Sequence, residues 1–141
     1  MRAMALDVGD RRIGVALSDP LGITAQRLTM IERTSLPKDL DAIAQLETAH
    51  EVEDLVVGLP LTMRGEVGDQ AKKVMHFVDA LKGKLHCRIH VLDERLTTVQ
   101  GERSLLATDT SRKRRKQLVD QIAAQLILQS YLDTKHARAQ D

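Results

Sequence analysis

Two short apolar segments, residues 4–8 and 13–17, open the chain on either side of a polar turn that contains Gly9. Apolar runs separated by a glycine-containing turn are typical of an antiparallel β-hairpin. Within the first run, Asp7 stands between two apolar neighbours. The strand that opens an α/β sheet is usually covered on both faces, and an unpaired buried carboxylate is costly. Asp7 is therefore interpreted as a site residue, the alternative being a solvated position on an edge strand.

The rest of the pattern switches between strand-like runs and helical spacing. Residues 54–59 form a continuous apolar run that Pro60 ends, which indicates a strand buried on both faces and hence a parallel sheet. A helix-start signal stands at Ser35, and the spacing of Thr97 and Gln100 fits a capping box. The patterns predict strands at 27–31, 54–59 and 88–92, helices at about 36–50, 71–81, 97–107 and 118–132, and a polar loop at 108–116.

This order of elements predicts an α/β fold in which the first strand is central, because a meander is followed by right-handed βαβ crossovers. A chain of 141 residues corresponds to one domain, here residues 1–135, with 136–141 as a frayed tail. Ligands of such open sheets bind outside the carboxyl ends of the strands, where the strand order reverses. Asp7 and Glu94 both approach that edge.

A third carboxylate, Asp120, lies in the last predicted helix. At about 3.6 residues per turn it is almost in line with Ile127, on the apolar side of the helix, and two alanines there would let the helix lie close to the sheet. The alternative is a carboxylate in the first helical turn that the helix dipole stabilises. Three converging carboxylates repel one another without bound cations, so Asp7, Glu94 and Asp120 together favour a site for Mg²⁺ or Mn²⁺.

Composition narrows the possible partners and compartment. Trp is absent and Phe and Tyr occur once each, so nucleic-acid affinity would have to come from Lys and Arg on phosphates rather than from aromatic stacking. A lone Cys87 forms no internal disulfide, and no apolar run matches a signal peptide or membrane span, which predicts a reduced, cytoplasmic protein with no membrane partner. Cys87 and its neighbours His86 and His90 lie in one strand, without the spacing of a zinc site.

Positive charge is concentrated near the proposed metal site, although the net charge is only +1. Each of these side chains could clamp a phosphate, although a single such charge is more often a solvated surface side chain. A basic run immediately precedes the helix of Asp120, which favours phosphate binding there. The candidate nucleic-acid ligands are Arg11, Arg12, Arg64 and Arg95, which follow strand ends, and the run Arg112, Lys113, Arg114, Arg115 and Lys116.

Four motifs in order resemble the YqgF/RuvX family of small bacterial ribonuclease H-like nucleases. They are DVGDRRIGVALSD from residue 7, VGLPL from residue 57, DERLTT from residue 93 and KQLVDQIAA from residue 116, and the match covers essentially the whole chain. The resemblance implies a five-stranded mixed sheet of order 3-2-1-4-5 with strand 2 antiparallel and helices on both faces. It also implies a metal-ligating triad of Asp7, Glu94 and Asp120. Related resolvases carry a fourth acidic residue where this chain has Gln117.

The family resemblance implies a nuclease that trims the 5′ end of precursor 16S rRNA or, in some members, cuts Holliday junctions. The partner would then be structured RNA or branched DNA, and the sequence leaves open whether the chain acts as a homodimer. Two other classes compete. Actin-like ATPases share the Asp-x-Gly opening but need a second such domain, for which 141 residues leave no room. A non-catalytic nucleic-acid-binding module would need the basic run but not the three carboxylates.

Overall fold

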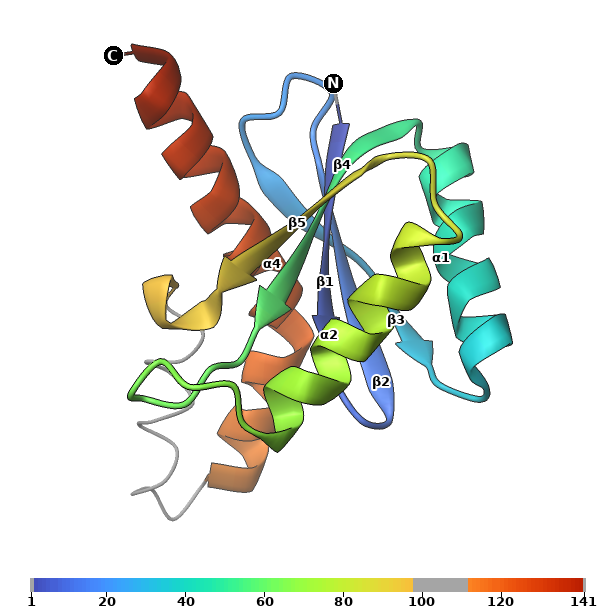
Figure 1. Cartoon of the computed structure of the whole chain (residues 1–141). Helices are drawn as coiled ribbons and strands as arrows, with labels where there is room; N and C mark the ends of the chain where they lie inside the picture. The colour runs from blue at the N-terminus through green and yellow to red at the C-terminus, as the bar shows by residue number, and fades with distance from the viewer. Residues whose placement is uncertain (1, 98–111, 141) are drawn as a thin grey trace.

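A five-stranded mixed sheet with the order β3-β2-β1-β4-β5 forms the centre of the structure (Figure 1). The computed structural model describes residues 2–97 and 112–140. Strand β2 is antiparallel to β1 and β3, whereas β4 is parallel to β1 and β5, so the predicted order and the central first strand are confirmed. The elements are β1 (Arg2–Val8), β2 (Arg12–Ser18), β3 (Ala25–Glu32), α1 (Leu36–Ala49), β4 (Val52–Leu59), α2 (Asp69–Lys82), β5 (Arg88–Asp93), the 3₁₀ helix η1 (Glu94–Leu96) and α4 (Arg112–Gln140).

The turn between β1 and β2 is tight. The Gly9 N–H donates a hydrogen bond of 2.9 Å to the carbonyl oxygen of Arg12. A Cβ built on Gly9 would lie 2.9 Å from that same oxygen, closer than real Cβ contacts. Glycine is therefore required here by the close approach of two backbone segments.

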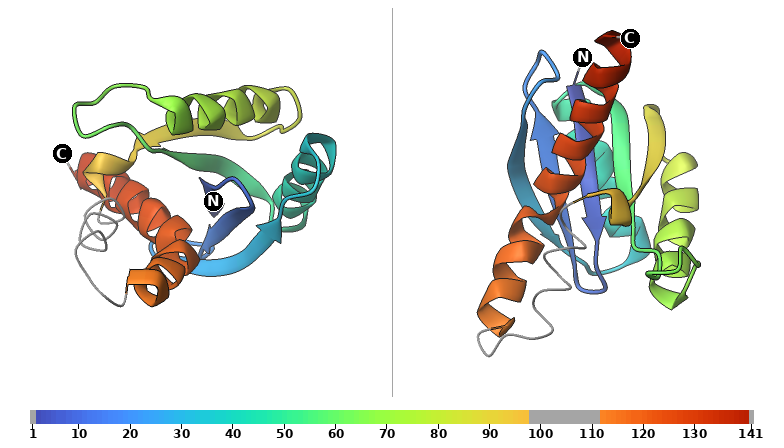
Figure 2. Two further views of the ribbon diagram at one scale, coloured as in Figure 1. Left: turned by 90° about the horizontal axis from the view of Figure 1, so that it is seen from below. Right: turned by 90° about the vertical axis from the view of Figure 1, so that its left-hand side faces the viewer.

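Helices α1 and α2 cover one face of the sheet and α4 covers the other (Figure 2). Because side chains alternate along a strand, β1 directs Met4 and Leu6 into the core beneath α1 and α2, and Ala3 and Ala5 towards α4. The next position in the second series is Asp7. The alternation therefore places the Asp7 side chain on the α4 face, at the carboxyl end of the central strand.

Small residues let α4 approach this face closely. A Cβ built on Gly14 of β2 would lie 3.7 Å from the Ala124 Cβ and 3.7 Å from the Asp120 carbonyl oxygen, which is ordinary contact distance. Buried side chains further along the helix, among them Ile127 and Leu132, continue the contact towards the opposite end of the sheet. The prediction of a helix lying close to the sheet is confirmed.

The start of α4 corrects one prediction. The helix begins at Arg112, so the basic run at 112–116 is helical and not part of a loop. The run lacks apolar periodicity, but Arg and Lys are good helix formers and no helix breaker separates them from the packed turns. The remainder of the predicted loop and most of the predicted helix at 97–107 lie outside the described residues.

The C-terminal end of the chain corrects a second prediction. Helix α4 continues to Gln140, so residues 136–140 are helical where a frayed tail was expected, and a nitrogen of the His136 ring lies 2.9 Å from the Gly22 carbonyl oxygen. Within the described residues, no helix combines the length and the apolar character needed to cross a bilayer.

Candidate active site

A cavity of about 560 Å³ opens at the carboxyl ends of β1 and β4. Asp7, Glu94 and Asp120, the three carboxylates singled out from the sequence, all line it, although 113 positions separate the first from the last. They come from β1, η1 and α4 respectively. The β1–β2 turn, Pro60 and Gln70 complete most of the wall.

Glu94 is the most deeply placed of the three, with 3% of its surface exposed. It begins η1 directly after β5, and the 3₁₀ turn is capped by Asp93, whose side chain accepts a hydrogen bond of 2.9 Å from the Arg95 N–H. The Glu94 side chain lies across β4 at Gly58, where a built Cβ would be 2.8 Å from its Oε1 atom. A glycine at this position of β4 is therefore what makes room for the Glu94 carboxylate.

Asp120 is half-buried and faces the cavity from the third turn of α4. Since the helix begins eight residues earlier, Asp120 lies too far from the N-terminus for the helix dipole to explain it, because that effect fades within the first turn. The position of Asp120 in α4 therefore removes the helix dipole as an explanation for this carboxylate.

The donor chemistry of the cavity suits a hard cation. Three carboxylates offer oxygen ligands of the kind that Mg²⁺ and Mn²⁺ prefer. Among the residues that the structure describes, no three His, Cys, Asp or Glu side chains are already grouped at metal-binding distances. The carboxylates thus share a cavity without forming a closed cluster, and each belongs to a different element.

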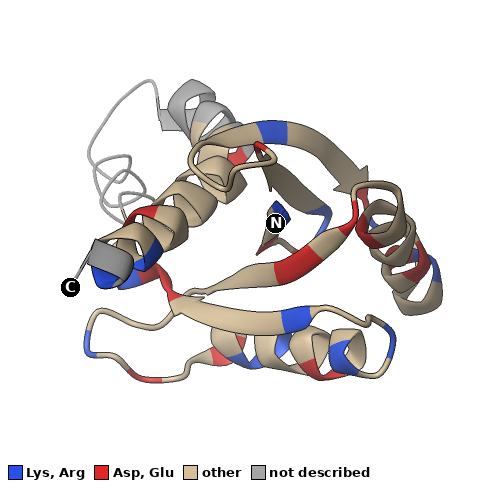
Figure 3. Cartoon of the chain, turned by 90° about the horizontal axis from the view of Figure 1, so that it is seen from above, with Lys and Arg blue, Asp and Glu red and all other residues tan. Residues whose placement is uncertain are grey.

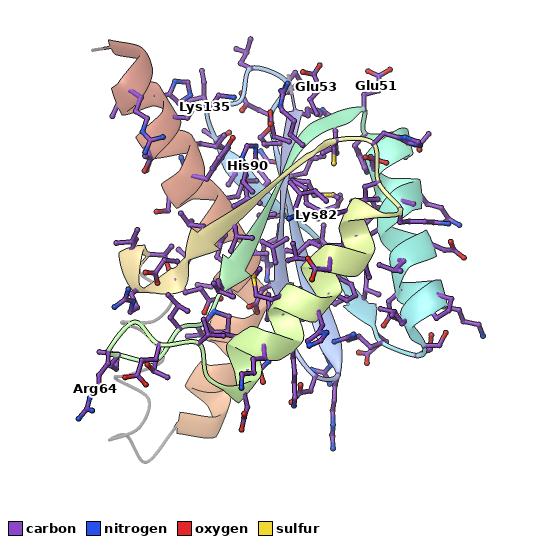
Figure 4. The ribbon with its side chains drawn as sticks, viewed as in Figure 1. Glu51, Glu53, Arg64, Lys82, His90 and Lys135 are labelled. Atoms are coloured by element: carbon purple, nitrogen blue, oxygen red, sulfur yellow. The ribbon has the colours of Figure 1, made fainter. Side chains whose placement is uncertain are left out.

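The predicted phosphate-binding residues separate into three groups. Arg11 and Arg12 line the cavity from the β1–β2 turn, and Arg12 also pairs with Glu32 at 3.0 Å on the exposed surface. Arg64 does not line the cavity and extends outward from the loop between β4 and α2 (Figure 4). For the basic run at 112–116 the structure describes the backbone but not the side chains, so their contacts lie outside its description.

Arg95 has a local partner and is not among the cavity-lining residues. Its Nη2 atom lies 2.7 Å from Oδ2 of Asp93, and this pairing lowers the pKa of Asp93. A Cβ built on Gly65, whose φ of +82° also favours glycine, would lie 2.9 Å from the Arg95 guanidinium. Arg95 therefore links η1 to the loop after β4, a contact that residue spacing does not reveal.

Three cavity residues were not among the sites predicted from the sequence. Gln70, the second residue of α2, lines the cavity, and its position two residues after the glycine-containing loop was the available signal. Asp10 was left out of the predicted triad; it lines the cavity and pairs with Lys73 of α2 at 3.3 Å. Met30 of β3 also contributes to the wall, and nothing in its sequence context indicated that role.

Solved structures resemble this fold. RuvC of T. thermophilus in complex with a Holliday junction substrate matches with a TM-score of 0.63 at 12% sequence identity, covering 96% of each chain. The Holliday junction resolvase of fowlpox virus matches with a TM-score of 0.52 at 13% identity, covering 95% of this chain and 99% of the viral one. At such low identity these matches establish the ribonuclease H-like fold and nothing about the chemistry.

Relatives in sequence are much closer. A protein of Moorella thermoacetica named "Putative pre-16S rRNA nuclease" is 54% identical over 133 residues, covering 94% of this chain and 95% of the relative. A protein of Desulforamulus reducens with the same name is 49% identical over 134 residues, covering 95% and 98%. The model of the RuvX family, described as Holliday junction resolvase, matches residues 1–134. The chain therefore belongs to the RuvX family, as its motifs suggested.

Proposed function

We propose that this protein is a divalent-metal-dependent nuclease that processes the 5′ end of precursor 16S rRNA. The observation that carries the proposal is the convergence of Asp7, Glu94 and Asp120 on one cavity at the carboxyl edge of the sheet. The names of relatives at about half identity over nearly the whole chain support the choice of substrate.

The three carboxylates would hold Mg²⁺ or Mn²⁺, each contributing oxygen ligands from a different element. Such cations supply activation of the attacking water and stabilisation of the departing 3′ oxygen, which predicts 5′-phosphate and 3′-hydroxyl ends. Arg11 and Arg12 line the same cavity as the carboxylates, and we expect them to bind phosphates that flank the one being cleaved. Gln117, in place of a fourth acidic residue, leaves the site with less negative charge for a second cation.

Cleavage of a precursor-rRNA fragment and of a four-way DNA junction, side by side with Mg²⁺ and with Mn²⁺, tests this proposal. We expect cleavage of the RNA near the mature 5′ end, 5′-phosphate products and full inhibition by EDTA. Products with 2′,3′-cyclic phosphate ends, or cleavage that continues in EDTA, would contradict the mechanism. Preferential cleavage of the junction would instead support Holliday junction resolution, the activity that the RuvX family description names. This is the second candidate function.

Replacing Asp7 with Asn distinguishes a metal-ligand role of Asp7 from a structural role. If the three carboxylates exist to hold cations, Asp7→Asn lowers kcat/KM by orders of magnitude while the metal-free protein melts no lower than wild type, because carboxylate repulsion is relieved. Asp54→Asn removes the same charge at the opposite end of the sheet and is the matched control, with normal cleavage per folded molecule expected. A lower melting temperature of Asp7→Asn, with activity lost only in proportion to unfolding, would assign Asp7 a structural role.

A further inference from the structure

Arg33, the residue after β3, makes contacts that reach three other segments. Its Nη1 atom donates a hydrogen bond of 2.8 Å to the Gly9 carbonyl oxygen in the β1–β2 turn. Its Nε atom donates to Oδ2 of Asp39 in α1 at 3.1 Å. The guanidinium also lies 5.0 Å from the centre of the Phe77 ring of α2, within the range of a cation–π contact.

The backbone of the same segment adds two more bonds. The Arg33 N–H donates to the Arg11 carbonyl oxygen at 2.9 Å, and the Thr34 N–H donates to Oδ1 of Asp39 at 3.1 Å. Both oxygens of the Asp39 carboxylate are therefore engaged, one with the Arg33 side chain and one with the next backbone amide. Asp39 is 3% exposed, so Arg33 is held from a buried, rigid anchor.

The turn that Arg33 holds is part of the candidate active site. Gly9, Arg11 and Arg12 all line the cavity, and the turn follows Asp7 by only two residues. In contrast, Arg33 itself is not among the cavity-lining residues. A peptide group is planar, with its C=O and N–H pointing in opposite directions, so the bond to the Gly9 carbonyl also sets the direction of the Asp10 N–H.

We propose that Arg33 is a positioning residue for the nuclease reaction, holding the β1–β2 turn between Asp39 and the cavity so that Arg11 and Arg12 meet the substrate's phosphates in a set geometry. This inference rests on the proposed function, since it assumes a nucleic-acid substrate in the cavity. Without the Arg33 side chain, the Gly9 carbonyl would lose its link to the buried Asp39, leaving the backbone bond from Arg33 to Arg11 and the exposed Lys73–Asp10 pair to hold the turn. The two arginines would then have more freedom to lose at the moment of binding, which weakens affinity.

Because phosphate contacts away from the reacting bond bind ground state and transition state alike, their loss raises KM more than it lowers kcat. For Arg33→Gln we expect KM for the RNA to rise about tenfold, the size of one lost charge-assisted hydrogen bond, with kcat within about twofold. Arg33→Lys keeps a cation near Gly9 but lacks the planar guanidinium that donates to Gly9 and Asp39 at the same time, so we expect an intermediate KM. Asp39→Asn, which releases the anchor, should raise KM in the same way.

The matched control is Arg27→Gln, at an exposed arginine of β3, the strand that Arg33 follows; it changes net charge equally at a position outside the β1–β2 turn. Melting curves establish the folded fraction of each variant, and Arg33→Lys and Asp39→Asn keep the test valid if Arg33→Gln folds poorly. RNA affinity without divalent metal is measured in parallel. Equal KM and equal metal-free RNA affinity for the Arg33 and Arg27 variants would overturn the positioning role. Absence of cleavage by the wild type would instead overturn the proposed function. In that case the comparison of metal-free RNA affinities would still decide whether Arg33 positions the turn.

Discussion

Gly58 shows how one missing side chain shapes the candidate site. A Cβ at this position would lie 2.5 Å from Cδ1 of Ile127 and 2.8 Å from Oε1 of Glu94, so two buried side chains would have to move. We expect Gly58→Ala to lower the free energy of unfolding by about 1–3 kcal/mol through overpacking. Displacement of the Glu94 carboxylate should also lower kcat by up to about a hundredfold.

Urea unfolding and single-turnover cleavage measure these two effects. Gly14→Ala is the comparison, because its added Cβ would meet its neighbours at ordinary contact distances of 3.4–3.7 Å. The effect on stability should therefore be smaller there. Equal stability and equal turnover for Gly58→Ala and wild type would show that Glu94 is not confined by the glycine.

Among the elements, α4 is joined to the sheet at the end opposite the cavity by a buried carboxylate, Asp54 of β4. Arg88 at the start of β5 donates to both of its oxygens at 2.8 and 3.1 Å, and a nitrogen of the His90 ring lies 2.9 Å from Oδ1. Lys135 of α4 reaches the same carboxylate at 3.9 Å; Figure 4 labels Lys135 and His90 at this end of the molecule. The Tyr131 ring of α4 lies tilted against His90, with the ring centroids 5.4 Å apart. Figure 3 views the molecule from this end and shows acidic and basic residues interspersed across it.

This network predicts a pH-dependent contribution to stability. Hydrogen bonding to Arg88, against the opposing effect of burial, lowers the pKa of Asp54 from 3.8 to about 2. A carboxylate with a depressed pKa in the folded state contributes stability that is full above the unfolded pKa and is lost as pH falls through the folded pKa. We expect Asp54→Asn to lower the free energy of unfolding by about 1–2 kcal/mol at pH 7, a value discounted because Arg88 is solvent-exposed.

Denaturant unfolding at several pH values tests this expectation. The gap between wild type and Asp54→Asn should narrow as pH falls from about 4 towards 2. Asp41→Asn removes an exposed ion pair with Lys84 and should change stability little at any pH. A gap for Asp54→Asn that stays constant down to pH 2 would mean that the lost contacts are not those of the ionised carboxylate.

The first turns of α4 place the basic run before Asp120 on one continuous helix. Replacing Lys113, Arg114 and Arg115 with Ala should remove up to three phosphate contacts and flatten the slope of log affinity against log salt by up to about 2–3 units on duplex DNA. Turnover at saturating substrate should stay near the wild-type value, since remote contacts bind ground and transition states alike. Lys82→Ala with Lys84→Ala, at the end of α2 away from the cavity, is the control. An unchanged slope would assign the run to solvated surface.

On the scale of the whole molecule, metal binding should be visible as stability. Ligands that bind only the folded state stabilise it by mass action, by about 2.7 kcal/mol at a hundred times the dissociation constant. Mg²⁺ or Mn²⁺ should therefore raise the melting temperature of wild type, EDTA should reverse the rise, and Asp7→Asn should lose most of it. An equal rise in wild type and Asp7→Asn would place the cation elsewhere on the molecule.

The sequence by itself determined the strands, the two helices α1 and α2, and the three candidate metal-binding carboxylates. A continuous apolar run identified β4, and cap signals and periodicity identified α1 and α2, because these features depend on neighbours in the chain. The position of Asp7 in the first strand and the helical phase of Asp120 predicted that the two carboxylates would approach each other, without knowledge of the contacts. The family motifs added the strand order, which the structure confirms.

Only the tertiary structure decided which charged residues are paired and where α4 begins. Arg33 reaches back 24 positions to Gly9, and Arg88 reaches back 34 positions to Asp54. Such pairings depend on how the elements pack in space, and local pattern carries no record of them. Arg95 also pairs with Asp93, only two residues away, and this local pairing depends on the 3₁₀ turn η1, which the sequence patterns did not predict. Apolar periodicity marks only the turns of a helix that pack on a core, so it missed the basic turns with which α4 begins.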